Sequence, residues 1–249
     1  MDEIYSPAEY SIGYPEGIEF NFWNLARNDL LYGILASVVK DDELVMDVGC
    51  GPGIFLGSVQ EKPINARGVE RGSPELKPSL ESIIDTGTDL FDLDLALRQD
   101  IKVVVLLDVI EHIADRQEFL QRIYSQVPNC QYLLVTVPAR MEVWSNFDKD
   151  WGHYLRYDRP GLDRELAAGG FKTIRSGYYF QWVYLAMLVM KILGVERGSD
   201  FKSPTRSRTT AFFHRVLGFF TRVESRLVPG FVAGSSIVCL AARDQDGIK

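Results

Sequence analysis

Three nearly continuous apolar runs constrain the fold of this chain more than any other feature. They are LVMDVGC (44–50), IKVVVLLDVI (101–110) and CQYLLVTVP (130–138). Runs of this kind are typical of strands that are buried on both faces of a parallel sheet. Neighbouring parallel strands need a crossover connection, and stretches with helical spacing separate these runs. The sequence therefore predicts an α/β fold with a doubly wound, mostly parallel sheet and helices on both of its faces.

Shorter patterns predict the remaining elements of this fold. Strands are expected at 66–71, 171–180 and 235–243. Helices are expected at 20–40, 73–84, 116–127, 158–170 and 211–227. Asp115 with Glu118 forms a capping-box pattern before one helix, Asp158 is the expected cap of another, and Ser73 and Pro74 are typical of a helix start.

The regions of the chain follow from this order of elements. We expect a single domain over residues 1–249, because 249 residues with 46% hydrophobic content can bury one full core. Its expected parts are an N-terminal helical cap (1–40), a cofactor-binding core (41–180), a helical insert or lid before the last strand (181–230), and the last strand with a tail (231–249).

The insert contains an amphipathic stretch, AFFHRVLGFFTRVESRL (211–227). Apolar residues at 212, 216, 219, 220, 223 and 227 share one helical face, and Arg215, Arg222 and Arg226 share another. The interpretation that we favour is a lid helix packed on the body of the protein. Contact with a membrane is the alternative.

Charge and cysteine usage limit the function classes. The net charge is −7, but residues 191–249 carry 10 basic and 5 acidic residues, whereas residues 1–190 carry 17 and 29. An acidic body argues against nucleic-acid binding, while the basic end could meet an anionic surface or pair with the body. Cys50, Cys130 and Cys239 lie far apart without metal-binding spacing, and no signal peptide is evident. We expect a cytoplasmic protein, with peripheral membrane contact through 181–230 left open.

A glycine-rich loop follows the first apolar run. Asp47, Gly49, Gly51 and Gly53 lie where the predicted strand ends, and ligands bind at this end of the strands in open parallel sheets. The dinucleotide fingerprint requires G-x-G-x-x-G, but Ile54 occupies the position of its third glycine. The phosphate-binding loop ending in Gly-Lys-Ser/Thr is absent. Neither pyrophosphate nor triphosphate therefore fits this loop well.

The stretch VMDVGCGPG (45–53) resembles motif I of the class I S-adenosylmethionine-dependent methyltransferases. In that family the loop wraps the amino-acid part of the cofactor, and a carboxylate at the end of the next strand holds the ribose hydroxyls. That carboxylate corresponds to Glu70 in GVER. An ionised carboxylate only accepts hydrogen bonds, so it suits a diol.

Further stretches resemble the branch that includes ubiquinone-pathway O-methyltransferases and the type 11 and type 23 methyltransferases. They are LLDVIEHI (106–113), LLVTVPAR (133–140) and DKDWGHYLRYDRPGLDRELAAGGF (148–171). The resemblance covers about residues 20–180 and implies a Rossmann-like, seven-stranded sheet. It implies S-adenosylmethionine as cofactor, with S-adenosylhomocysteine as product.

The resemblance also suggests which residues bind the cofactor. Asp108 and Val109 would contact the methionine portion, and Asp89, or else Asp85, would lie on the adenine side. Arg27, together with Trp23, either closes over the cofactor carboxylate or is an ordinary residue of its helix. The expected cofactor-binding residues are Asp47, Gly49, Cys50, Gly51, Gly53, Glu70, Asp89, Asp108, Val109 and Arg27.

The chain contains three histidines, which are the natural proton acceptors near neutral pH. Methyl transfer is an in-line displacement in which a hydroxyl acceptor usually needs a base, whereas an amine or thiolate does not. His112 and His153 lie in the family-like motifs, and His214 lies on the basic helix. We favour His153, then His112, as catalytic residues, although Glu111 and His112 could also form a structural pair.

Asp108, Glu111, His112 and His153 are also a conceivable divalent metal site. Because the resemblance assigns Asp108 to the cofactor, we predict no bound metal.

The acceptor is expected to be a small or lipid-like molecule. The stretch TVPAR lacks the Asn-Pro-Pro-aromatic pattern of methyltransferases that act on DNA adenine or glutamine amides, which again argues against nucleic acid. The aromatic insert favours a lipid-like, quinone-like or polyketide-like acceptor, methylated on a hydroxyl oxygen. The alternative function is a non-catalytic cofactor-binding module that engages a membrane or protein through its basic C-terminal helix. A nicotinamide oxidoreductase is the third choice. The oligomeric state is not predicted.

Overall fold

A computed structural model describes residues 7–196 and 203–245 of the chain. Residues 1–6, 197–202 and 246–249, which include parts of the predicted cap, insert and tail, lie outside the described residues. The chain divides into two compact units. Of the described residues, the first unit contains 7–93 and 203–227, and the second contains 94–196 and 228–245.

The first unit contains the glycine loop and three parallel strands. Strand β1 pairs with β2, and β2 pairs with β3, both in parallel. Every residue of β1 is buried, as its apolar sequence predicts. The elements of this unit are α1 (Pro7–Gly13), η1 (Ile18–Phe20), α2 (Phe22–Leu35), β1 (Leu44–Val48), α3 (Ile54–Val59), β2 (Asn65–Glu70), β3 (Ile84–Thr86), η2 (Leu90–Asp92) and α9 (Arg208–Leu227).

The second unit contains the other four strands. Strand β4 pairs with β5 in parallel, and β7 pairs antiparallel with both β5 and β6. Its elements are α4 (Leu95–Asp100), β4 (Ile101–Leu107), η3 (Ile110–His112), α5 (Arg116–Gln126), β5 (Tyr132–Pro138), η4 (Met141–Val143), α6 (Asn146–Asp150), α7 (Arg159–Ala168), β6 (Phe171–Tyr179), α8 (Gln181–Ile192) and β7 (Ser236–Arg243).

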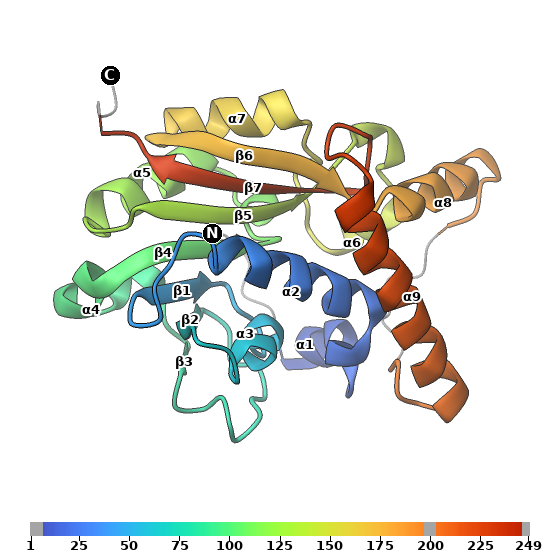
Figure 1. The fold of residues 1–249 in the computed structure, drawn as a ribbon, viewed down its shortest axis with the longest axis horizontal. Coiled ribbons are helices and arrows are strands. Elements are labelled where there is room, and N and C mark those ends of the chain that lie inside the picture. Colours follow the sequence, from blue (N-terminus) through green and yellow to red (C-terminus); the bar gives the residue numbers. More distant parts are fainter. Residues whose placement is uncertain (1–6, 197–202, 246–249) are drawn as a thin grey trace. The chain divides into compact units, whose positions relative to one another are not determined.

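The strand order is β3-β2-β1-β4-β5-β7-β6 (Figure 1). Helices α8 and α9 come between β6 and β7 in the chain, where the helical insert was expected. The predicted caps also form, since the Asp115 side chain accepts from Glu118 N and the Asp158 side chain accepts from Gly161 N. The α/β fold class, with a mostly parallel seven-stranded sheet, is confirmed.

The helix predicted at 73–84 is wrong. The residues between β2 and β3 form turns and irregular chain, and β3 begins at Ile84. Pro78 lies inside the predicted helix, where it has no backbone N–H to donate and its ring would clash with the preceding turn. The apolar residues of this stretch instead join a core cluster, in which Leu80 and Ile84 pack with Leu56.

Helix α9 packs on the first unit, but not through its apolar stripe. It lies alongside α2 (Figure 1), and its buried residues are Gly218 and Thr221. Two arginines of the basic face reach α2: Arg222 donates to the Leu25 carbonyl and Arg226 pairs with Asp29 at 3.1 Å. The exposed side chains of the helix include Phe212, Phe213, Phe219, Phe220 and Leu227, each at 59–75% exposure.

Small buried residues and the arginine hydrogen bonds occupy the side of α9 that faces α2. The aromatic face of the helix is therefore the exposed one. Among the described residues, no helix is both long and apolar enough to cross a bilayer.

Candidate functional site

The glycine loop uses backbone conformations that favour glycine. Gly49, Gly51 and Gly53 have φ values of 72°, 55° and 79°, all in the left-handed region. Gly53 has a second constraint, because a Cβ there would lie 2.5 Å from the Ile84 Cδ1 atom. Its role therefore includes close packing at the start of α3. Hydrogen bonds from the backbone amides of Gly49 and Gly51 link the end of β1 to the end of β2.

Glu70 ends β2 and holds this loop in place. Its Oε2 accepts from Gly51 N at 2.8 Å, and its Oε1 accepts from Gly72 N at 2.9 Å. The Tyr10 hydroxyl of α1 also hydrogen-bonds to Glu70; burial and the Glu70 charge raise the pKa of Tyr10, so this hydroxyl remains a donor. A carboxylate offers about four lone-pair sites. Glu70 thus anchors the loop and is also the residue predicted to bind the ribose.

Asp47 is a buried carboxyl group without a hydrogen-bond partner among the described residues. It is 1% exposed, and neither side-chain oxygen is paired there. Burial raises the pKa of Asp47 to about 7, while the charge of Arg27 opposes this shift. A buried, unpaired carboxylate is costly unless a ligand satisfies it.

Other residues predicted to bind cofactor already have local contacts. The Asp89 side chain caps η2 by accepting from Phe91 N at 3.1 Å, and it lies 3.6 Å from the Arg71 guanidinium. Asp85, the alternative, pairs with Arg67 at 3.2 Å. Burial raises the pKa of Cys50 well above its ordinary value, so this residue is a neutral thiol. The cofactor roles of Asp89 and Cys50 stay predictions.

Asp108 and Val109 follow β4 in the second unit. Asp108 adopts a left-handed conformation with φ 56°, which is strained for a residue with a side chain. Thr136 of β5 holds it there: Asp108 N donates to the Thr136 carbonyl and hydroxyl, and that hydroxyl lies 3.2 Å from Asp108 Oδ1. Val109 is 8% exposed. Such strain gathers at functional sites, and the predicted cofactor contacts of both residues remain predictions.

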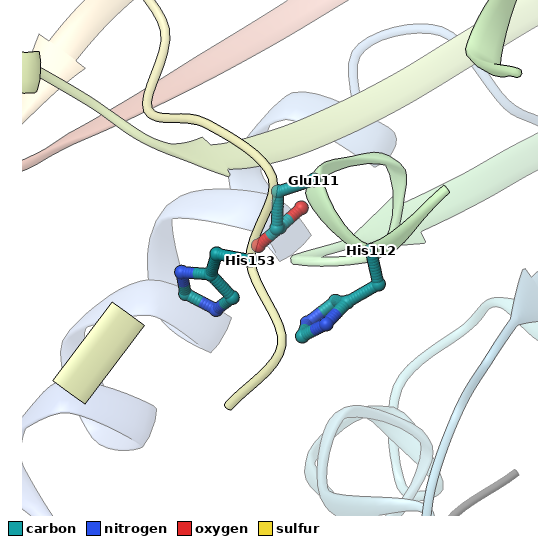
Figure 2. A group of neighbouring side chains, drawn as sticks. All are labelled: Glu111, His112 and His153. Carbon is teal, nitrogen blue, oxygen red and sulfur yellow. The ribbon is translucent and has the colours of Figure 1, made fainter. Parts of the chain in front are cut away.

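The second unit brings His112 and His153 together with Glu111. The two imidazole rings are 4.7 Å apart in an edge-on arrangement. Figure 2 shows the carboxyl group of Glu111 beside both rings, and the potential ligand atoms of the three residues all lie within 4.8 Å of one another. Burial, and then the charge of His153, lower the pKa of His112 to about 3, so His112 is neutral.

A buried ion pair positions His153. Asp148 in α6 is fully buried, and its Oδ1 lies 3.0 Å from His153 Nδ1 and 2.7 Å from Arg156 Nε. Burial alone would raise the pKa of Asp148, but the hydrogen bond with His153 and the charge of Arg156 lower it to about 2. The ionised carboxylate therefore accepts a hydrogen bond from His153 Nδ1 and fixes the orientation of the imidazole ring.

Sequence reasoning missed Asp148 and Arg156. The pattern S-x-x-D at 145–148 was a usable signal, since the Asp148 Oδ2 accepts from Ser145 N at 2.9 Å in a capping box. The third histidine, His214, lies in α9 of the first unit and accepts from Phe22 N at 3.3 Å. It belongs to the support of α2 rather than to the His112 and His153 group.

The strand order together with a glycine loop after β1 defines a class I, S-adenosylmethionine-dependent methyltransferase. The methyltransferase domain family model matches residues 28–176, so the chain belongs to that family. The predicted resemblance, enzyme class and cofactor are confirmed by this match. No curated protein matches the sequence.

Solved structures share the fold at low sequence identity. The 1,6-didemethyltoxoflavin-N1-methyltransferase of Burkholderia thailandensis has a TM-score of 0.56 at 12% identity, over 98% of this chain and 93% of that one. The magnesium protoporphyrin IX methyltransferase of Synechocystis PCC 6803 has 0.51 at 13%, over 98% and 90%. A phosphoethanolamine N-methyltransferase of Haemonchus contortus has 0.55 at 13%, over 97% and 59%. At these identities the likeness supports the fold alone.

Proposed function

We propose that the protein methylates a hydroxyl oxygen of an apolar acceptor. The observation that carries this proposal is the Asp148–His153 pair, in which a buried carboxylate lies 3.0 Å from His153 Nδ1 and fixes the ring, so that Nε2 is the nitrogen left to face an acceptor. A hydroxyl must lose its proton to become a good nucleophile, whereas an amine acceptor can react without such a base. Bound S-adenosylmethionine supplies a methyl group activated by a sulfonium. His153 accepts the hydroxyl proton in this scheme.

The first unit holds the cofactor in this proposal. The unpaired, buried carboxyl group of Asp47 supports it, because a cationic ammonium would satisfy both its charge and its oxygens. The remaining lone-pair site of Glu70 accepts from a ribose hydroxyl, while its bonds to Gly51 and Gly72 keep the loop in shape. Arg27, whose charge acts on Asp47 and whose Nε donates to Asn28 Oδ1, is the residue that we expect to contact the cofactor carboxylate.

A cavity in the second unit supports an apolar acceptor. Its volume is about 230 Å³, and it lies between the η4–α6 region and α8. Met187, Met190, Val143 and Trp144 line it, and methionine side chains adapt to irregular apolar ligands. The polar side chains of Asn146, Lys191 and Glu196 also line it. Ser145 also lines the cavity and donates to Asp148, so the cavity adjoins the residues that position His153.

Paired acceptors test this proposal directly. Labelled S-adenosylmethionine is offered with apolar molecules that carry either a hydroxyl or an amine at the same position. The proposal expects the label on the hydroxyl acceptor. Transfer to the amine analogues alone would contradict it.

We also propose that the exposed face of α9 contacts a lipid surface. Four phenylalanines, Phe212, Phe213, Phe219 and Phe220, are at least 59% exposed on this helix. Arg208 and Arg215 are exposed on the same helix, and a helix with aromatic and basic residues is typical of binding at an anionic membrane interface. Contact with a lipid surface would bring the protein to an apolar acceptor that resides in a membrane.

Vesicle flotation measures this contact. We expect the wild type to float with vesicles of phosphatidylcholine and phosphatidylserine, because burying two phenylalanine side chains gives about 3 kcal/mol or more. A Phe219→Ser/Phe220→Ser variant should remain with the unbound protein. The matched control is Leu95→Ser, an exposed apolar residue of α4. Equal flotation of all three proteins, or concentration-dependent self-association lost in the double variant, would contradict a lipid contact.

A further inference from the structure

Glu111 is a buried acidic residue of the second unit. It is fully buried, and neither of its carboxylate oxygens has a hydrogen-bond partner among the described residues. Buried carboxylates are normally paired, because the desolvation of an unpaired one costs several kcal/mol. Arg156, the nearby buried cation, is engaged by Asp148 and by the Ala139 carbonyl. The Glu111 carboxyl group thus needs a partner that the side chains around it do not provide.

The two neighbouring histidines each have one ring nitrogen already committed. The His153 Nδ1 lies 3.0 Å from Asp148 Oδ1, and the His112 ring hydrogen-bonds to the backbone of Trp151. Metal-binding histidines characteristically use one nitrogen for such a carboxylate or carbonyl, which fixes the tautomer and presents the other nitrogen to the ion. Both imidazoles therefore have the outer contacts that a ligand histidine requires.

We propose that Glu111, His112 and His153 bind a divalent transition-metal cation. Their ligand atoms lie within 4.8 Å of one another, and Figure 2 shows the three side chains gathered at one place. Ligands at about 2.1 Å from one ion are at most about 4.2 Å apart, so small side-chain rotations close the site. Two imidazoles and a carboxylate suit zinc, cobalt, iron or manganese better than magnesium, and leave coordination positions open.

This site departs from the sequence-based prediction of no metal, and it does not use Asp108, which Thr136 holds. Its role rests on the proposed function: an ion with open positions lowers the pKa of a hydroxyl that binds to it. With the ion bound, His153 would be a ligand, so this inference keeps the hydroxyl acceptor of the proposed function but replaces His153 by the ion as the group that promotes loss of the hydroxyl proton. Cation binding itself does not depend on methyl transfer.

Titration of Co²⁺ into protein dialysed against EDTA tests the site. Calorimetry and visible absorption report binding, and thermal unfolding reports whether each variant is folded and whether Co²⁺ stabilises it. We expect one Co²⁺ per chain in the wild type. Glu111→Gln, which preserves shape, and His112→Ala should each weaken binding at least about tenfold, given that even outer contacts change affinity by about 10–100-fold. The matched control is His214→Gln, a histidine of the other unit.

The outcomes separate this inference from the proposed function. A lack of saturable Co²⁺ binding, or equal binding by the wild type, Glu111→Gln and His112→Ala, would overturn the metal site. Hydroxyl methylation that persists in EDTA without Co²⁺ binding would then leave His153 as the proton acceptor. Conversely, stoichiometric Co²⁺ binding without any methylation of hydroxyl acceptors would support the metal site and count against the proposed function.

Discussion

An Asp148→Ala variant is expected to lose about 3–5 kcal/mol of the free energy of unfolding. Arg156 is 5% exposed, and Asp148 is its buried counter-ion at 2.7 Å. Removal of the carboxylate would leave a buried guanidinium without a partner, which is far more costly than the loss of a surface ion pair. It would also remove the acceptor for Ser145 N and so uncap α6.

Urea unfolding at pH 7 measures this effect. Asp150→Ala is the matched control, because Asp150 is an exposed acid in the same helix and its loss should change the free energy of unfolding by less than about 0.5 kcal/mol. Asp148→Asn should lie between the two, since its amide oxygen can still accept from Arg156. A loss below about 1 kcal/mol in Asp148→Ala would show that the ion pair does not stabilise the second unit.

A His153→Ala variant is expected to lose about 10²- to 10⁴-fold in kcat with a hydroxyl acceptor, the usual contribution of a positioned acid–base group. A bound cation that needs His153 as ligand would lead to the same loss. The affinity for S-adenosylhomocysteine should stay within a factor of about two, because the cofactor residues of the first unit are untouched. The measurement is methyl transfer from labelled S-adenosylmethionine at saturating acceptor.

His214→Gln is the control for this variant, because the same residue type is changed in α9, where it accepts from Phe22 N. Wild-type kcat in His153→Ala would contradict a role for His153 in removing the hydroxyl proton. An equal loss in both variants would point to a general effect on the fold instead.

The long buried strands could be predicted because few other structures are compatible with such apolar sequences. Strand β1 is buried at every position, and β5 is buried at all but its first, so neither could form on a surface. Strand β3 was missed, because three residues carry little periodicity and the Ser73–Pro74 start imitates a helix. The helix that this pattern predicted does not form, since Pro78 prevents it.

The candidate site could be predicted only where it depends on local sequence. The glycine loop follows from the local sequence after β1, and Glu70 follows from the resemblance of this region to the methyltransferase family. The roles of Asp148 and Arg156 depend on burial and on which side chains meet, and a charge in the sequence does not show whether it will be buried. The direction of α9 was hidden for a similar reason, because Arg222 and Arg226, not the phenylalanines, face α2.

Calorimetric titration of S-adenosylhomocysteine tests most directly whether the glycine loop is the cofactor site. The proteins are the wild type, Asp47→Asn and Glu70→Gln, with Glu75→Ala as an exposed acidic control and NADH as the control ligand. We predict that the wild type and the control bind S-adenosylhomocysteine alike, that neither binds NADH, and that both site variants lose at least about 1 kcal/mol, or about fivefold in affinity. Unchanged affinity in both site variants, or binding of NADH in place of S-adenosylhomocysteine, would contradict the assignment of this loop.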